Sequence, residues 1–239
     1  MLLLLLLRKR IACQSFLEQA ANPNPSLETT TVTQTSTVPV TQTATTTSTV
    51  IAYAVATTIA SNGAQYRQYQ SPFSGDVNAA YFKTVSPDYS GTSSSLTFST
   101  PNWPSDSSYS ITLADGYTFY SYQSALLFQG FFIAKETGTY LFYPNSGEVD
   151  NWGYVWTGSN AYAAWTDGNE NFKNHYDGGD TTMSTSIQMN AGDAVPLTYL
   201  WINTGGPGRS KFRIHTPGGT ELNGGDGYFV KACSAATFP

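Results

Sequence analysis

The sequence has little charge, histidine and cysteine. Only 11% of its 239 residues are charged, the net charge is −5, and no basic patch stands out, so a nucleic-acid partner is not expected. Its two histidines and two cysteines form no cluster that could hold zinc. The run Leu2 to Leu7 is far shorter than the about 20 apolar residues of a membrane-spanning helix, so membrane insertion is not expected either.

Other signals are missing at the chain's start and along its length. A secretory signal carries its positive charges before the apolar run, whereas Arg8 to Arg10 follow it here, so the pattern assigns residues 1–26 no role. No Asn-x-Ser/Thr sequon with an allowed middle residue occurs. Cys13 and Cys233 either form one disulfide or stay separate thiols.

What the chain does contain is typical of an extracellular β-rich protein, with 14% aromatic residues and 16 tyrosines. Residues 27–60 form a second segment, in which 29–50 consist mostly of Ser and Thr. Such a composition cannot bury a core, and it suits either an O-glycosylated stalk or a plain disordered linker. The folded domain is expected over residues 61–239.

Short β-strands are predicted through this domain, at a spacing of about ten residues between Gly, Pro, Asn and Asp turns. This pattern indicates an all-β fold, a β-sandwich of jelly-roll type. A tight hairpin turn is predicted at Lys135–Gly138, between two aromatic strands. The predicted strands are Ser94–Phe98, Ala125–Ala134, Gly138–Tyr143, Gly153–Thr157, Ser186–Asn190, Val195–Asn203, Lys211–Thr216 and Gly227–Ala232.

Two polar segments stand at strand ends. Asp150 and Asn151 precede a strand in which aromatic residues alternate with Gly, Val and Thr. Asn203 closes another predicted strand and is followed by the glycine-rich run to Gly208. Each segment alone is an ordinary turn former. Together they offer the side-chain and main-chain oxygens that a hard cation such as calcium prefers.

These segments resemble the calcium-binding loops of the GLEYA-type fungal adhesin domain, a relative of yeast flocculins and of the protective-antigen-like lectin domain. Val149-Asp150-Asn151 followed by an aromatic strand is similar to the first loop, and the segment from Trp201 to Gly208 is similar to the second. Further similarity lies in the pieces Gly63–Tyr69, Tyr81–Thr84 and Asp88–Gly91. In that family two consecutive acidic residues, joined by a cis peptide bond, hold a calcium ion that in turn binds sugar hydroxyls.

The resemblance implies a residue-by-residue assignment of the site. The side chains of Asp150, Asn151 and Asn203 and the main-chain carbonyls of Gly205 and Pro207 would bind Ca²⁺, while Asp150, Asn151, Thr204 and Gly206 would contact the sugar. An amide replaces the second acid here, and one carboxylate fewer predicts weaker calcium binding. The polar segment from Asp167 to Asp180 is a candidate rim of the site, with His175 or Tyr176 as stacking residues.

The function expected from this resemblance is that of an extracellular adhesin of the cell surface or cell wall. It would bind glycans with a terminal hexose, such as mannose or galactose, through the loop-bound calcium. The alternative is a structural cell-wall module of the same fold without lectin activity. A carbohydrate-active enzyme is a third reading that no motif supports. There is no Gly-x-Ser-x-Gly elbow, and His175 and His215 lack triad spacing, so the chain is not expected to be an enzyme.

Overall fold

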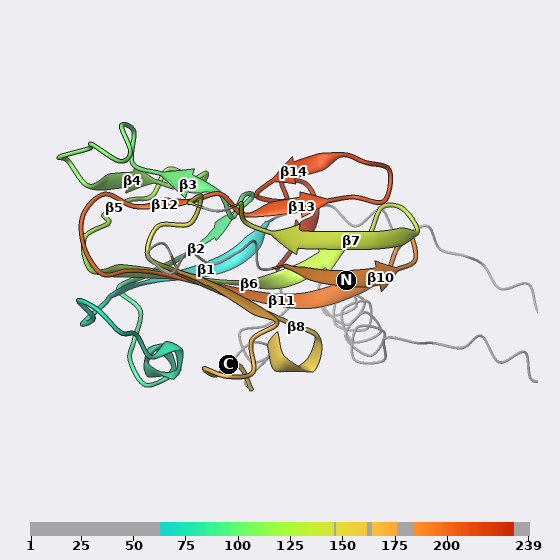
Figure 1. The fold of residues 1–239 in the computed structure, drawn as a ribbon, viewed down its shortest axis with the longest axis horizontal. Helices are drawn as coiled ribbons and strands as arrows, with labels where there is room; N and C mark the ends of the chain where they lie inside the picture. Colours follow the sequence, from blue (N-terminus) through green and yellow to red (C-terminus); the bar gives the residue numbers. More distant parts are fainter. Residues whose placement is uncertain (1–62, 146, 162–163, 176–183, 232–239) are drawn as a thin grey trace, which may run out of the picture.

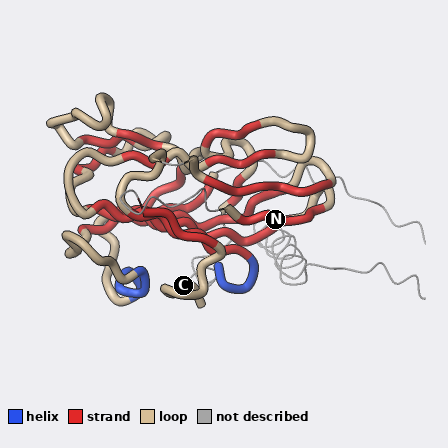
Figure 2. The backbone as a smooth tube through the Cα atoms, in the orientation of Figure 1, coloured by secondary structure: helices blue, strands red, loops and turns tan. Residues whose placement is uncertain are grey.

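The computed structural model describes residues 63–145, 147–161, 164–175 and 184–231. This part of the chain is a β-sandwich with two short 3-10 segments, which confirms the predicted all-β fold (Figures 1 and 2). Residues 1–62, and with them the expected stalk and Cys13, lie outside the described residues, as do Tyr176 and Cys233. None of the helices in the described residues is long and apolar enough to cross a membrane.

The larger layer is an antiparallel sheet of seven strands with β6 and β11 at its centre. Along the sheet the order is β2-β1-β6-β11-β8-β9, and β15 also pairs with β6. The strands are β1 (Ala64–Gln70), β2 (Tyr89–Ser93), β6 (Ser124–Ile133), β8 (Trp152–Thr157), β9 (Phe172–His175), β11 (Ala194–Asn203) and β15 (Phe229–Val230).

The second layer is a four-stranded sheet in the order β10-β7-β13-β14. Figure 1 shows β7 and β13 lying over the larger sheet. Aromatic side chains from both layers fill the space between them, among them Phe128, Phe132, Tyr140, Phe142 and Trp201. The strands of this layer are β7 (Gly138–Tyr143), β10 (Thr185–Met189), β13 (Arg213–His215) and β14 (Glu221–Asn223).

Two small ribbons stand at one end of the sandwich: β3 (Phe98–Ser99) pairs with β12 (Arg209–Ser210), and β4 (Ser110–Thr112) pairs with β5 (Thr118–Tyr120). The outer face of the larger sheet carries a second apolar cluster, which includes Trp156, Trp165 and Leu200. The 3-10 segments η1 (Ala79–Lys83) and η2 (Gly158–Ala161) contribute Ala79, Phe82 and Ala161 to it. Because β6 and β11 are covered on both faces, their sequences are almost continuously apolar.

Five predicted strands are confirmed to within one residue, namely β6, β7, β8, β10 and β11. The strand predicted at Ser94–Phe98 is wrong except at Phe98. Serine side chains hold the backbone there, since the Ser93 hydroxyl donates to the Ser95 carbonyl and the Thr97 amide donates to the Ser95 hydroxyl. Such local hydrogen bonds compete with strand pairing.

The hairpin predicted at Lys135–Gly138 is also wrong. Both edges of β6 are already paired, with β1 and β15 on one side and β11 on the other, so β7 joins the opposite sheet. The link between the layers is fixed by the Tyr140 hydroxyl, which accepts hydrogen bonds from the Lys135 and Glu136 amides. The sequence pattern for a turn was correct, but the pairing partner depends on which sheet edges are free.

Candidate functional site

The two polar segments predicted to form a site meet in space. Strand β8 pairs antiparallel with β11, with Trp152 opposite Ile202, so the residues before β8 lie beside the residues that end β11. The Asn151 side-chain nitrogen lies 2.9 Å from the Asn203 side-chain oxygen. We call Ser121, Asp150, Asn151 and Asn203–Gly206 the loop cluster.

Asn203 is the centre of the loop cluster. It is completely buried, and its amide makes four hydrogen bonds. The oxygen accepts from the Asn151 amide and from the Gly205 backbone N–H at 3.0 Å. The nitrogen donates to the backbone carbonyls of Ser121 at 2.9 Å and Gly206 at 3.2 Å. Because an amide has two donor hydrogens and two acceptor lone pairs, Asn203 is fully satisfied and joins three separate loops.

Asn151 adopts a backbone conformation that few residues tolerate. Its φ is +58°, in the left-handed region where Asn is among the better-accepted residues. Its side-chain oxygen accepts a hydrogen bond from the Thr204 hydroxyl. The cis peptide bond that the resemblance implies between Asp150 and Asn151 is not found, since among the described residues only Trp103–Pro104 is cis.

Asp150 is buried beside a cation and two hydrogen-bond donors. Its side chain is 8% exposed, and burial raises the pKa of its carboxyl to about 6, although side-chain hydrogen bonds from Asn151 and Trp103 and the charge of Arg209 act in the opposite direction. The Arg209 guanidinium stacks 3.6 Å from the centre of the Trp103 ring. The carboxylate therefore has neighbours that offset its negative charge in part, although burial outweighs them.

The glycine-rich loop after β11 is shaped by close packing. Gly206 has a φ of +76°, and its carbonyl accepts hydrogen bonds from the Ser121 hydroxyl at 3.1 Å and from Asn203. A Cβ at Gly208 would lie 2.6 Å from the Trp201 ring, so only glycine fits there. The predicted sugar contact Gly206 thus lends its carbonyl to the internal network.

As arranged, these groups do not fit a calcium ion. Calcium needs six to eight oxygens with free lone pairs. The Asn203 oxygen, an expected ligand, already accepts two N–H groups, and the Asn151 oxygen accepts the Thr204 hydroxyl. Calcium binding at Asp150, Asn151, Asn203, Gly205 and Pro207 stays a prediction from the sequence, and this hydrogen-bond pattern does not favour it.

Exposed tyrosines beside the loop cluster were not anticipated. Tyr120 and Tyr122 are 56% and 42% exposed, and the residue between them, Ser121, is the one that binds Asn203 and Gly206. Their rings lie 6.2 Å apart, and each lies within 6.2 Å of the Tyr109 ring. A Cβ at Gly205 would be 3.5 Å from the Tyr122 ring. The sequence signal that could have indicated them is the Tyr120-Ser121-Tyr122 pattern.

Backbone strain is concentrated in the same region. Three non-glycine residues of the described chain have positive φ, namely Asn151, Tyr109 and Gln123. The Tyr109 carbonyl accepts the Ser121 N–H at 2.6 Å, and Gln123 follows Tyr122 directly. Each such residue costs of order 1–3 kcal/mol and persists where surrounding contacts over-determine it, which is typical of binding sites.

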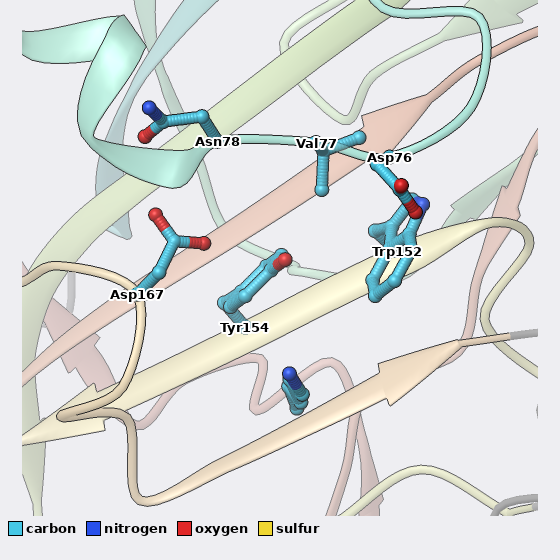
Figure 3. Close-up of a pocket in the computed structure, with 7 residues that line it drawn as sticks. Asp76, Val77, Asn78, Trp152, Tyr154 and Asp167 are labelled. Carbon is cyan, nitrogen blue, oxygen red and sulfur yellow. The ribbon is translucent and has the colours of Figure 1, made fainter.

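A separate open pocket of about 420 Å³ lies on the outer face of the larger sheet (Figure 3). Trp152 and Tyr154 project from β8 toward the loop that carries Asp76 and Val77. Burial raises the pKa of the Tyr154 hydroxyl, and the charge and hydrogen bond of Asp167 raise it further.

Asp167, one of the polar residues of this pocket, helps to hold the fold. Asp167 accepts the backbone N–H groups of Ala79 at 2.8 Å and Ala80 at 3.4 Å, which fixes the start of η1. Asp167 therefore faces this pocket rather than the loop cluster. His175, predicted as a stacking residue for sugar, stacks on Trp152 at 3.9 Å instead. The rest of the predicted rim, 176–180, lies outside the described residues.

Comparison with known proteins supports the sequence motifs. The family model of the GLEYA domain matches residues 124–216, a range that contains Asp150, Asn151 and the whole loop after β11. No curated protein sequence matches the chain.

Solved structures share the architecture at low identity. The Epithelial Adhesin 6 A domain from Candida glabrata, in complex with Galβ1-3GlcNAc, has a TM-score of 0.58 and 18% identity, covering 75% of this chain and 92% of its own. The Epithelial Adhesin 9 A domain from the same organism, also with Galβ1-3GlcNAc, has a TM-score of 0.56 and 12% identity, covering 74% and 93%. These likenesses establish the fold. The predicted resemblance to a GLEYA-type fungal adhesin domain is therefore confirmed, by the family match over residues 124–216 and by the lectin fold around it.

Proposed function

We propose that this chain is a cell-surface adhesin domain that binds glycans at the loop cluster, with Tyr120 and Tyr122 as the surface on which a sugar ring stacks. The observation that carries the proposal is the pair of exposed tyrosine rings directly beside a buried, strained polar network. Aromatic rings that present an apolar face together with a polar edge suit a hexose, which has an apolar face of C–H groups and hydroxyls around its edge.

Thr204 and the carboxylate of Asp150 are the polar groups proposed to recognise hydroxyls. Thr204 is half-buried, and its hydroxyl already donates to Asn151, so its two lone pairs are available to a sugar hydroxyl. The β-galactosyl disaccharides held by the related Candida adhesins are the first ligands to test, and terminal mannose is the second. An extracellular location on the cell surface or cell wall is part of the same proposal.

The test is a glycan array with the full chain, followed by titration of the best ligand. Tyr122→Ala is expected to weaken binding roughly 5- to 150-fold, because removing an aromatic ring on which a ligand stacks costs about 1–3 kcal/mol. Tyr89→Ala is the matched control, since Tyr89 is equally exposed at 42% but its ring stacks on Tyr117 rather than beside Tyr122. Equal weakening by both substitutions would contradict the proposed platform.

Absence of binding to every glycan by a folded wild-type chain would favour the alternative, a structural cell-wall module of the same fold without lectin activity. One observation in the described structure supports this alternative. Every polar group of the Asn203 side chain is satisfied internally, so the loop cluster can also serve only to hold the loops together.

A further inference from the structure

We propose that the side-chain amide of Asn151 takes the place of a calcium ion in this chain: its N–H groups join the Asp150 carboxylate to the Asn203 oxygen, so the loop cluster is ordered without metal. The inference concerns how the loops are held together, and it does not require that the proposed glycan binding be correct.

The orientation of Asn203 is dictated by the backbone. A backbone N–H, from Gly205, faces one end of its amide, and two backbone carbonyls, from Ser121 and Gly206, face the other end. Flipping the amide would place NH₂ against an N–H and the oxygen against two carbonyls. Since Asn203 is fully buried, no water can relieve such a mismatch. Its oxygen must therefore point at Asn151.

The orientation of Asn151 follows from that of Asn203. An acceptor at 2.9 Å requires a donor, so the NH₂ of Asn151 must face Asn203 and its oxygen must face the Thr204 hydroxyl, which donates to it. Burial raises the pKa of the neighbouring Asp150 carboxyl, and a side-chain hydrogen bond from Asn151 acts against that rise. An amide nitrogen has two hydrogens, enough for both oxygens. A group with positive partial charge thus bridges the two oxygens that a cation would otherwise bridge.

Charge balance points the same way. Burial acts against the negative charge of the single carboxylate, Asp150, and the charge of Arg209 and a hydrogen bond from Trp103 offset it only in part. With aspartate at position 151, two adjacent carboxylates and the Asn203 oxygen would face one another with no donor between them. Such a cluster of acceptors needs a cation to be stable. Asparagine removes that need.

The experiment compares the full-length wild type with Asn151→Asp by thermal unfolding in chelator and in millimolar calcium, and by calorimetric titration with calcium chloride. We expect the wild type to show no saturable heat and the same melting temperature in both buffers. Asn151→Asp should melt lower in chelator and recover in calcium, with a rise of roughly 5–10 °C when calcium is a hundredfold above its Kd. Asn151→Ala is the matched variant, expected to melt lower in both buffers with no recovery.

Saturable calcium binding by the wild type, with a raised melting temperature, would overturn the proposal and support the metal site that the motifs imply. Absence of any calcium response in a folded Asn151→Asp would overturn the claim that the amide occupies the cation's position. If Asn151→Asp does not fold even in calcium, the wild-type titration still decides between loops ordered without metal and a calcium site. None of these measurements uses a glycan, so they stand apart from the test of the proposed function.

Discussion

The indole nitrogen of Trp201 donates a hydrogen bond to the main-chain carbonyl of Asp150 at 2.9 Å. Trp201 lies in β11 with its ring fully buried, packed edge-on against Phe98 with ring centres 5.0 Å apart. Trp201 therefore ties the Asp150 segment directly to the hydrophobic core, while Asn203, two residues further along the same strand, holds the loop that contains Ser121. One strand sets the spacing of both.

Trp201→Phe is expected to destabilise the domain and to loosen the loop cluster. The substitution leaves the Asp150 carbonyl without its donor and opens a cavity, for a loss of about 2–4 kcal/mol in the free energy of unfolding. Urea denaturation measures the loss, and titration with the best glycan measures the effect on the site.

Tyr199→Phe is the control for this substitution. It also removes a buried hydrogen bond from β11, that between the Tyr199 and Ser210 hydroxyls at 2.6 Å, but it leaves the loop cluster untouched. We expect both variants to be less stable, Tyr199→Phe by the smaller amount because it opens little cavity, and weaker glycan binding only from Trp201→Phe. Unchanged binding by Trp201→Phe would show that the indole does not position the loop.

Acid sensitivity is expected from the ion pair of Glu148 and Arg213. Burial alone raises the pKa of Glu148, but two hydrogen bonds at 2.6 Å and the charge of Arg213 outweigh it, so the folded-state pKa lies below the usual value. The stabilisation is therefore complete above the unfolded-state pKa of about 4.3, and it is lost as the pH falls through the lowered folded-state pKa.

Glu148→Gln tests that linkage. It should reduce the free energy of unfolding by about 2 kcal/mol at neutral pH, and the difference from the wild type should shrink as the pH falls below about 4. Chemical denaturation at a series of pH values measures both the loss of stability at neutral pH and its decrease as the pH falls. A difference that is independent of pH would mean that packing of the Glu148 side chain, rather than its charge, provides the stabilisation.

Asp167→Ala is expected to release the start of η1 without affecting the loop cluster. The substitution removes the acceptor for the Ala79 and Ala80 amides, both of which should then exchange their hydrogens faster in deuterated water. Glycan binding at the loop cluster should be unchanged, because Asp167 lines the pocket in Figure 3 and binds the start of η1 rather than that cluster. Weaker glycan binding by this variant would place the site at the pocket instead.

The strands that the sequence predicted correctly are those whose own residue pattern is enough to specify a β-strand. Strands β6 and β11 are long and apolar on both faces, β7 buries Tyr140 and Phe142 at alternate positions, and β8 alternates aromatic with smaller residues, so periodicity was sufficient. Short strands such as β9 and β14 were missed because polar segments like Phe172–His175 pair only where a neighbouring strand offers an edge. That information is not local.

The candidate site was predicted in its membership but not in its internal contacts. The motifs placed Asp150, Asn151 and Asn203 together, and the structure brings them together. The motifs did not indicate Ser121, whose carbonyl and hydroxyl come from a different loop. Nor could spacing reveal that the Asn203 oxygen is used by two N–H donors, because that depends on the direction of the side chain.

The pairing of β6 has a consequence for how the domain is presented. Gly63 donates to the Phe229 carbonyl at 3.1 Å, and both β1 and β15 pair along one side of β6, so the first and last described strands meet near its Ile133 end. The loop cluster lies at the other end, where Ser124 faces Asn203. A strand of ten residues spans roughly 33 Å. Any segment attached before residue 63 thus joins the domain at the end of β6 opposite the loop cluster.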